Sequence, residues 1–352
     1  MPTGRVLLTG ISGFIGSHVA LALLYAGYHV RGSLRDMSRA GEVAQMLERA
    51  GADLSRLEFV PLDLMEDAGW REAMRGVRYV QHIASPLTVR MPVDRDELIR
   101  PAVEGTRRCL AAALSADVER IVVTSSAAAI SYGHPPEKTA FSEADWSNLD
   151  AEGISAYTES KTRAELEAWS LAEAAGRTGD LAVINPVVVL GPLLGADHGV
   201  SALLIKRLLS GVPFVPRMQL ELVDVRDVAA LHVNAMTSPR AAGRRHIAAA
   251  PPIQFIDLAR HLAKSEPRFA ARLPRREAPD ALVRLYALFD RDARAAVANL
   301  GHPRHFDTSA GTALLGRAFI SAEAAAAATA RSLIELGLVR GSPREKTTEK
   351  RG

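Results

Sequence analysis

The sequence predicts an α/β protein with a doubly wound parallel sheet, followed by a smaller and mostly helical lobe. Short apolar runs alternate with helical patterns over the first 190 residues, and this alternation is typical of parallel strands joined by crossover helices. A glycine-rich turn follows the first apolar run directly. Beyond Gly191 the alternation stops and helical spacing dominates, which indicates a second lobe and a cleft between the two.

The expected strands are short and rich in β-branched residues. In chain order they are RVLLT (5–9), HVRGSL (29–34), FVPLD (59–63), YVQHIAS (79–85), RIVVTSS (120–126), LAVINPVVVLG (181–191) and RRHIAAA (244–250). The apolar spacing of VDVRDVAALHVNAM (223–236) and the alanine run at 322–330 predict helices. We assign 1–192 and 222–250 to the first domain, 193–221 and 251–340 to the smaller lobe, and 341–352 to a disordered tail.

Composition excludes several classes of function. The net charge is +3, but basic and acidic residues are interleaved, so nucleic acid is not an expected partner. Cys109 is the only cysteine, which excludes an intrachain disulfide, and no metal site is expected. No apolar run approaches the roughly 20 residues of a membrane span, and the start lacks the apolar region of a secretory signal. We expect a cytoplasmic protein without membrane contact.

The turn TGISGFIG connects the first strand to a helix, where backbone N–H groups and the helix dipole can hold a pyrophosphate. Glycine is needed there because a side chain would block the phosphate. The spacing is one residue longer than the usual dinucleotide motif, and an ordinary tight turn is the alternative. The predicted pyrophosphate site consists of Gly10, Ser12, Gly13, Phe14, Ile15 and Gly16.

The second expected strand ends in Leu34 and Arg35, where an NAD enzyme would place an acid against the ribose 2′-hydroxyl. An arginine can instead pair with a 2′-phosphate, helped by Arg31, Ser33 or Arg39, so the sequence predicts NADP. A solvated arginine is the alternative.

The next two strand ends complete the predicted cofactor groove. Asp63 could accept from the exocyclic amine of adenine, or it could cap a helix. We interpret His82 as a buried strand histidine, not as a base. The predicted contacts are Asp63 and Leu64 for adenine, and Ala84, Ser85 and Pro86 where the cofactor passes the sheet.

The strongest catalytic pattern begins at the fifth strand, which ends in Ser125 and Ser126, and about thirty residues later SAYTESK places Tyr157 and Lys161 on one helix face. A free tyrosine has a pKa of about 10, which a nearby ammonium would lower. Tyr157 is then the acid in reduction and the base in oxidation, Lys161 also binds the nicotinamide ribose, and Ser126 holds the substrate oxygen. Ser125 is the alternative serine.

In this order, TGISGFIG, HIASP, RIVVTSSAA, YTESK, INPVVVLGP and LVDVRDVAALHVNAM resemble an extended short-chain dehydrogenase/reductase. The resemblance covers about residues 4–250. Within the family, the chain most resembles the group of dihydroflavonol, cinnamoyl-CoA and aldehyde or methylglyoxal reductases. It implies a Ser126–Tyr157–Lys161 triad, a 2′-phosphate contact at Arg35, and a nicotinamide site at 185–188. Thr124, Ser125, Tyr157, Lys161, Pro186 and Val188 complete the predicted cofactor contacts.

Two departures bear on the substrate. Val188 stands where sugar-nucleotide epimerases carry asparagine, and GISAYTES replaces the Asn-Trp-Tyr-Cys-Tyr stretch of cinnamoyl-CoA reductases. We therefore expect an NADPH-dependent carbonyl reductase for an aldehyde or ketone, monomeric or homodimeric. The alternatives are a sugar-nucleotide epimerase or dehydratase, a hydroxysteroid-type dehydrogenase, and a non-catalytic NADP-binding redox sensor.

Overall fold

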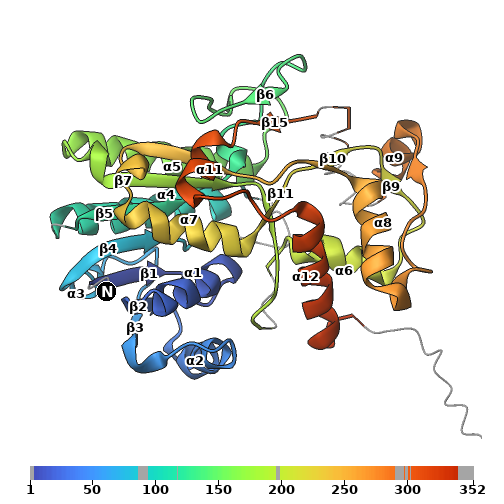
Figure 1. Cartoon of the computed structure of the whole chain (residues 1–352). Helices are drawn as coiled ribbons and strands as arrows, with labels where there is room; N and C mark the ends of the chain where they lie inside the picture. The colour runs from blue at the N-terminus through green and yellow to red at the C-terminus, as the bar shows by residue number, and fades with distance from the viewer. Residues whose placement is uncertain are drawn as a thin grey trace, which may run out of the picture.

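The computed structural model describes residues 4–85, 94–116, 118–195, 199–289, 297, 300–301 and 303–339. Within these residues one parallel sheet of seven strands forms the centre of the molecule, and it confirms the predicted fold class (Figure 1). Across the sheet the strands are β12 (Arg244–Ala248), β7 (Leu181–Pro186), β5 (Arg120–Thr124), β4 (Val77–His82), β1 (Arg5–Thr9), β2 (His29–Leu34) and β3 (Leu57–Pro61).

The seven predicted apolar runs supply these seven strands, although β3 and β4 begin and end two or three residues before the predicted limits. Strand order reverses between β1 and β4, because the chain first builds outward to β3 and then returns to the other side of β1. In open sheets of this kind, ligands bind beyond the carboxyl ends of the strands at such a switch point. The glycine turn after β1 lies at this position.

Alternate residues of each strand face opposite helical layers, as expected for a doubly wound sheet. Val6 and Leu8 belong to the core shared with α1 and α7, whereas Leu7 and Val80 belong to the core shared with α3, α4 and α5. One layer contains α1 (Phe14–Tyr25), α2 (Ala40–Arg49), α7 (Val225–Thr237) and α11 (Ser309–Leu315), and the other contains α3 (Trp70–Ala73), α4 (Asp96–Ser115) and α5 (Ala156–Ala174) (Figure 1).

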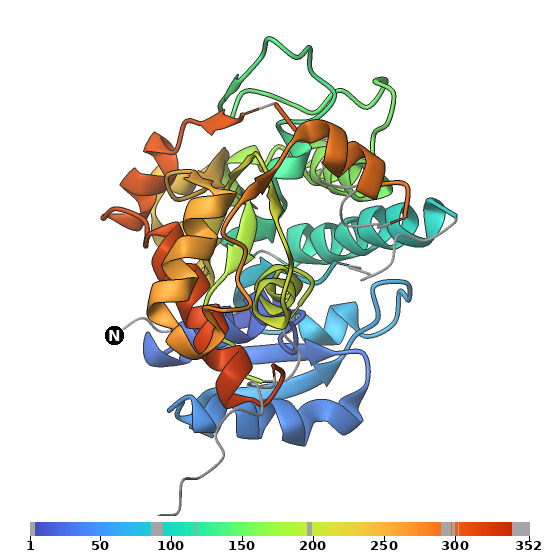
Figure 2. The ribbon, with the colours of Figure 1, turned by 90° about the vertical axis from the view of Figure 1, so that its right-hand side faces the viewer.

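The second lobe lies beyond the carboxyl edge of the sheet and has its own apolar core (Figures 1 and 2). Its elements are α6 (Ala202–Ser210), β9 (Val215–Pro216), β10 (Gln219–Leu220), β13 (Ile253–Gln254), α8 (Phe255–Ser265), β14 (Glu277–Ala278), α9 (Asp280–Tyr286) and α12 (Ala322–Glu335). The parallel pair β8 (Val188–Leu190) and β11 (Leu222–Asp224) connects the lobe to the sheet. The alanine run is helical, as predicted.

The chain after residue 251 is less purely helical than its pattern suggests. It contributes β13, β14 and β15 (His305–Phe306), and β15 pairs with β6 (Ala140–Phe141) beside the sheet. Next, α11 packs against α7 and β12, so this part of the chain returns to the first domain. The predicted tail at 341–352 lies outside the described residues. No described helix is long and apolar enough to cross a membrane.

Short 3-10 helices complete the connections: η1 (Met37–Arg39), η2 (Leu54–Arg56), η3 (Ala127–Ala129), η4 (Thr178–Asp180), η5 (Pro239–Ala241) and η6 (Pro267–Phe269).

Candidate active site

The turn after β1 requires glycine at two positions because the backbone passes very close to its neighbours. Gly10 has a φ of 74°, and a Cβ on it would lie 2.9 Å from the backbone of Ala84. A Cβ on Gly16 would lie 2.0 Å from the carbonyl oxygen of Gly10. The hydroxyl of Thr9 accepts from the N–H groups of Ile83 and Ala84 at 3.0 Å, which fixes the ends of β1 and β4 together.

The same turn leaves the N-terminus of α1 open to a ligand. Gly13 caps the helix without a side-chain hydrogen bond, and the N–H groups of Phe14, Ile15 and Gly16 precede the first intrahelical donor. A Cβ on Gly13 would meet only the Gly10 carbonyl oxygen, at 3.4 Å. The predicted residues therefore fit a pyrophosphate held by backbone donors. Ser12 lies in the turn and is half-buried.

Arg35 follows β2 and is exposed, which suits a contact with a bound anion. Of its predicted helpers, Arg31 is excluded by the structure. Its side chain is buried and donates to Glu58 and to the carbonyl oxygens of Ala73 and Arg75, at 2.7 to 2.9 Å. A guanidinium so engaged under the sheet cannot reach a ribose phosphate.

The other two helpers have different surroundings. Ser33 is buried in β2, and Arg39 contacts Glu42 at 3.4 Å. Arg35 is therefore the best placed of these side chains for a 2′-phosphate.

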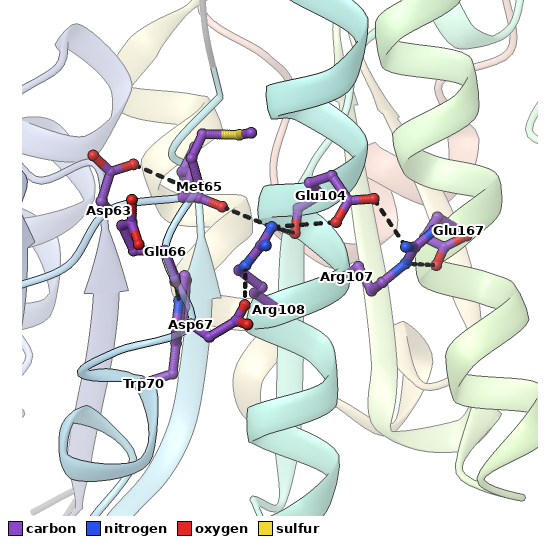
Figure 3. Close-up of polar contacts among 10 residues, drawn as sticks. Asp63, Met65, Glu66, Asp67, Trp70, Glu104, Arg107, Arg108 and Glu167 are labelled. Carbon is purple, nitrogen blue, oxygen red and sulfur yellow. Dashed lines mark hydrogen bonds and ion pairs between the residues drawn. The ribbon is translucent and has the colours of Figure 1, made fainter.

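The loop after β3 is held by its own turn and by α4 (Figure 3). Asp63 accepts from the N–H of Met65 at 2.8 Å, so its carboxylate closes a turn and does not cap a helix. Arg108 donates to the Leu64 carbonyl oxygen at 3.3 Å and pairs with Asp67 at 2.5 Å. These contacts fix the backbone at the predicted adenine edge.

Beneath this loop the ion pairs continue from α4 to α5. Glu104 pairs with both Arg107 and Arg108, and Arg107 pairs in turn with Glu167 at 2.7 Å (Figure 3). A Cβ on Gly105 would lie 2.9 Å from Leu64, so glycine there lets the loop lie directly on α4.

The end of β4 supplies a narrow, half-buried surface. Ala84 and Ser85 are half-buried there, while Pro86 lies outside the described residues. His82 is buried, its Nδ1 contacts the Thr9 hydroxyl at 3.0 Å, and burial lowers its pKa to about 3. A neutral, fully packed imidazole confirms the interpretation of a strand histidine.

Two of the three predicted catalytic side chains, Ser126 and Tyr157, are neighbours at the carboxyl edge of the sheet. Ser126 is buried, and its Oγ accepts from the N–H of Ala128 at 3.1 Å and donates to the Pro186 carbonyl oxygen at 3.5 Å. Tyr157 and the buried Lys161 are one turn apart on α5. In contrast, the Ser125 hydroxyl donates to Glu165 at 2.5 Å, behind the sheet end. These contacts favour Ser126 over Ser125.

The electrostatics differ from the sequence prediction at Tyr157. Burial raises the pKa of Tyr157, the neighbouring Ser126 hydroxyl lowers it by less, and Tyr132 raises it further. The expected net lowering by Lys161 is therefore not found in this structure, because desolvation of the phenolate dominates. Burial also lowers the pKa of Lys161 to about 8, with Glu165 acting in the opposite direction.

The nicotinamide end of the predicted groove is formed by β5 and β7. Thr124 is buried with its hydroxyl 2.9 Å from His232. Pro186 is buried, whereas Val188 is 44% exposed, so Val188 is available to a ligand. Asn185 donates to Glu165 at 2.8 Å and to the Ser126 carbonyl oxygen at 3.3 Å.

Sequence reasoning missed the buried residues that support this site. Glu165 follows Lys161 by one helical turn, and Arg245 stands in a predicted strand of the sheet, where a charged side chain needs a partner. They form an ion pair at 2.5 Å. His232 is likewise fully buried, between Thr124 and Gln81.

A cavity of about 230 Å³, lined in part by the segment that follows β12, contains none of the predicted site residues. Its lining includes Glu221, Arg304 and Phe306, and Arg304 also covers the ring of Tyr132 at 4.4 Å.

In the part of the chain that the structure describes, no group of three metal-ligating side chains occurs. Cys109 is buried, which raises the pKa of its thiol.

Comparison with known proteins agrees with the motifs. The model of the NAD dependent epimerase/dehydratase family matches residues 6–250. Cinnamoyl-CoA reductase 1 of Oryza sativa subsp. japonica is 36% identical over 270 residues, which cover 76% of this chain and 77% of the relative. Dihydroflavonol 4-reductase of Zea mays is 34% identical over 249 residues, covering 68% and 69%.

Solved structures share the same fold. Yeast methylglyoxal/isovaleraldehyde reductase Gre2, complexed with NADPH, has a TM-score of 0.80 at 23% identity and covers 95% of this chain and 99% of its own. Vestitone reductase of Medicago sativa has a TM-score of 0.74 at 22% identity, covering 96% and 100%. The family resemblance predicted from the motifs is thus confirmed, and the chain belongs to the NAD-dependent epimerase/dehydratase family.

Proposed function

We propose that the protein is an NADPH-dependent carbonyl reductase that converts an aldehyde or ketone to an alcohol. The observation that carries this proposal is that Ser126 neighbours Tyr157, with Lys161 one turn further along the same helix, at the carboxyl edge of the sheet that also carries the glycine turn after β1. The curated relatives above are named as reductases, which supports the redox assignment. A triad at the switch point of a doubly wound sheet suits transfer between a dinucleotide and a small molecule.

Tyr157 is the proton donor in this proposal. When bound, NADPH supplies a hydride to the carbonyl carbon, and the Tyr157 hydroxyl gives its proton to the carbonyl oxygen. The product is an alcohol with one new C–H bond and one new O–H bond. Burial keeps the pKa of Tyr157 above its usual value of 10, so the side chain is protonated at neutral pH. This state suits a general acid in the reductive direction.

Lys161 and Ser126 support that proton transfer. With a pKa of about 8, the Lys161 side chain is mostly an ammonium at neutral pH and can stabilise the tyrosinate that proton donation leaves. It can also donate to ribose hydroxyls. Ser126 lies within hydrogen-bond reach of Tyr157, so its hydroxyl can orient the same substrate oxygen.

Cofactor preference rests on the exposed guanidinium of Arg35, which can pair with a 2′-phosphate. The likeness to Gre2, which binds NADPH, is consistent with that preference. We assign cofactor binding to residues 1–192 and 222–250. We expect the carbonyl compound between this domain and the lobe of residues 193–221 and 251–340, from which β15 and α11 return to the first domain.

The proposal is tested by following NADPH and NADH oxidation with aldehydes, aryl ketones, α-keto esters, cinnamoyl-CoA and sugar nucleotides. Turnover of an aldehyde or ketone with NADPH, abolished in Tyr157→Phe, is the expected result. Turnover of cinnamoyl-CoA alone would overturn the substrate assignment. A tightly retained nicotinamide with epimerised sugar, or NADPH binding without any turnover, would overturn the reductase assignment.

A further inference from the structure

We propose that Glu165 is a positioning residue that, held by Arg245, keeps the side chain of Lys161 charged and in place from behind the active site. This inference rests on the proposed function for its kinetic consequences, but its physical basis is the packing around α5. It assigns a role in the site to two residues that are not among the predicted catalytic or cofactor-binding residues.

Glu165 is fully buried and gathers hydrogen-bond donors from several elements. Ser125, directly after β5, donates at 2.5 Å, Asn185 of β7 at 2.8 Å and Trp169 of α5 at 3.4 Å. Arg245 of β12 donates to both carboxylate oxygens, at 2.5 and 3.3 Å. The carboxylate therefore fixes α5 against the ends of the strands that carry Ser126 and the nicotinamide contacts.

Arg245 completes this arrangement from the edge of the sheet. It donates to the carbonyl oxygens of Glu143 and Asp145 at 2.9 and 2.6 Å, and its guanidinium lies 3.8 Å from the ring centre of Trp146. The ion pair thus joins α5, β12 and the segment after β6. Its side chains are 0% and 7% exposed, so water screens it little.

Burial of an ion pair does not by itself stabilise a protein, because desolvation of both charges can exceed their attraction. A positional role next to the reacting groups is a better explanation of its presence. Glu165, one turn away on α5, raises the pKa of Lys161. On β4, burial and the charge of Lys161 lower the pKa of His82 to about 3, so this side chain is neutral at the pH of the reaction. Glu165 is therefore the anion that favours the charged form of Lys161.

The test compares variants that differ in the charge near Lys161. Glu165→Gln removes the carboxylate but leaves the buried Arg245 guanidinium without its anionic partner, so this variant could fail to fold. The double variant Glu165→Gln with Arg245→Met leaves no buried charge and is the main test. Glu167→Gln is the matched control, because it removes a carboxylate two residues along the same helix, from an ion pair with the half-exposed Arg107.

The first readout needs no substrate: the Lys161 ¹³Cε resonance, assigned with Lys161→Arg, is titrated in selectively labelled protein. We expect a midpoint near pH 8 in the parent and in Glu167→Gln, and a midpoint lower by about one pH unit in the double variant. Equal midpoints in all three would overturn the inference, even if the double variant is less stable.

The second readout is the pH profile of kcat for NADPH-dependent reduction. The alkaline limb of the double variant should begin about one pH unit lower, with the KM for NADPH changed less than kcat. A lower kcat with an unshifted limb would indicate a purely structural role and contradict the proposal. If the parent reduces no carbonyl, the proposed function fails, while the resonance titration still decides the role of Glu165.

Discussion

At the end of β5, two adjacent serine hydroxyls have different partners. The Ser126 hydroxyl lies beside Tyr157, whereas the Ser125 hydroxyl donates to the buried Glu165. The backbone alternation of a strand end turns neighbouring side chains in opposite directions. One serine therefore faces the chemistry, and the other supports the helix that carries it.

Replacing each serine should separate these roles. We expect Ser126→Ala to lower kcat about 100-fold, because a donor to the substrate oxygen is lost. Ser125→Ala should lower the free energy of unfolding by about 1 to 3 kcal/mol, because a buried acceptor loses a donor, and should lower kcat much less. Steady-state kinetics and urea unfolding measure the two effects. The reverse pattern would make Ser125 the catalytic serine.

Arg35 should determine the choice between the two nicotinamide cofactors. We expect Arg35→Glu to raise the KM for NADPH roughly thirtyfold, equivalent to about 2 kcal/mol, because an acid repels a 2′-phosphate. The KM for NADH should change little. Arg49→Glu, an exposed arginine at the end of α2, is the control. An equal change for both cofactors would place Arg35 away from the 2′-phosphate.

At the scale of elements, the connection from β1 to α1 combines a steric and an electrostatic requirement. Gly16 allows the helix to approach the Gly10 carbonyl oxygen, and the open first turn of α1 then faces the carboxyl edge of the sheet. Thr9 links this turn to the end of β4. The cofactor groove thus depends on contacts between elements that are adjacent in the sheet.

Gly16→Ala should disrupt that connection. Its added Cβ would lie 2.0 Å from a backbone oxygen, so the turn must shift. We expect a fall of several kcal/mol in the free energy of unfolding and a loss of NADPH binding. Gly41→Ala in α2 meets nothing within 4 Å and should be neutral or stabilising by up to about 1 kcal/mol. Thermal melts and fluorescence titration compare them, and equal behaviour would refute the steric account.

Elements differed in how far the sequence could predict them. Strands such as β5 and β7 contain runs of apolar, β-branched residues, so their composition alone marks them. The pair of β6 and β15 was not predictable, because two-residue strands separated by over 150 residues have no local pattern. Arg31 shows the same limit among the site residues: its acceptors come from β3, the end of α3 and the turn after it, which only the folded chain brings together.

At the scale of the whole molecule, buried neutral histidines connect stability to pH. Burial lowers the pKa of His82 and of His232 to about 3, and that of His246 to about 4. The unfolded chain protonates these side chains near pH 6.5. Because the folded pKa values are depressed, the unfolded state binds more protons below pH 6.5, and stability falls as the pH falls.

We expect the free energy of unfolding to be lower at pH 5 than at pH 7, by about 2 kcal/mol for each buried histidine. Urea unfolding at the two pH values measures the difference. Replacing the exposed His29 with glutamine should leave the difference unchanged, whereas His232→Gln should reduce it. A protein equally stable at both values would show that these imidazoles are hydrated in solution.

The most direct test of the central proposal follows the hydride itself. NADPH deuterated at both C4 positions is incubated with the best aldehyde or ketone, and the alcohol is analysed by mass spectrometry. The account predicts one deuterium on the former carbonyl carbon with the parent protein, and none with Tyr157→Phe, although that variant should still bind NADPH. An alcohol without deuterium, or full transfer in Tyr157→Phe, would contradict carbonyl reduction through Tyr157.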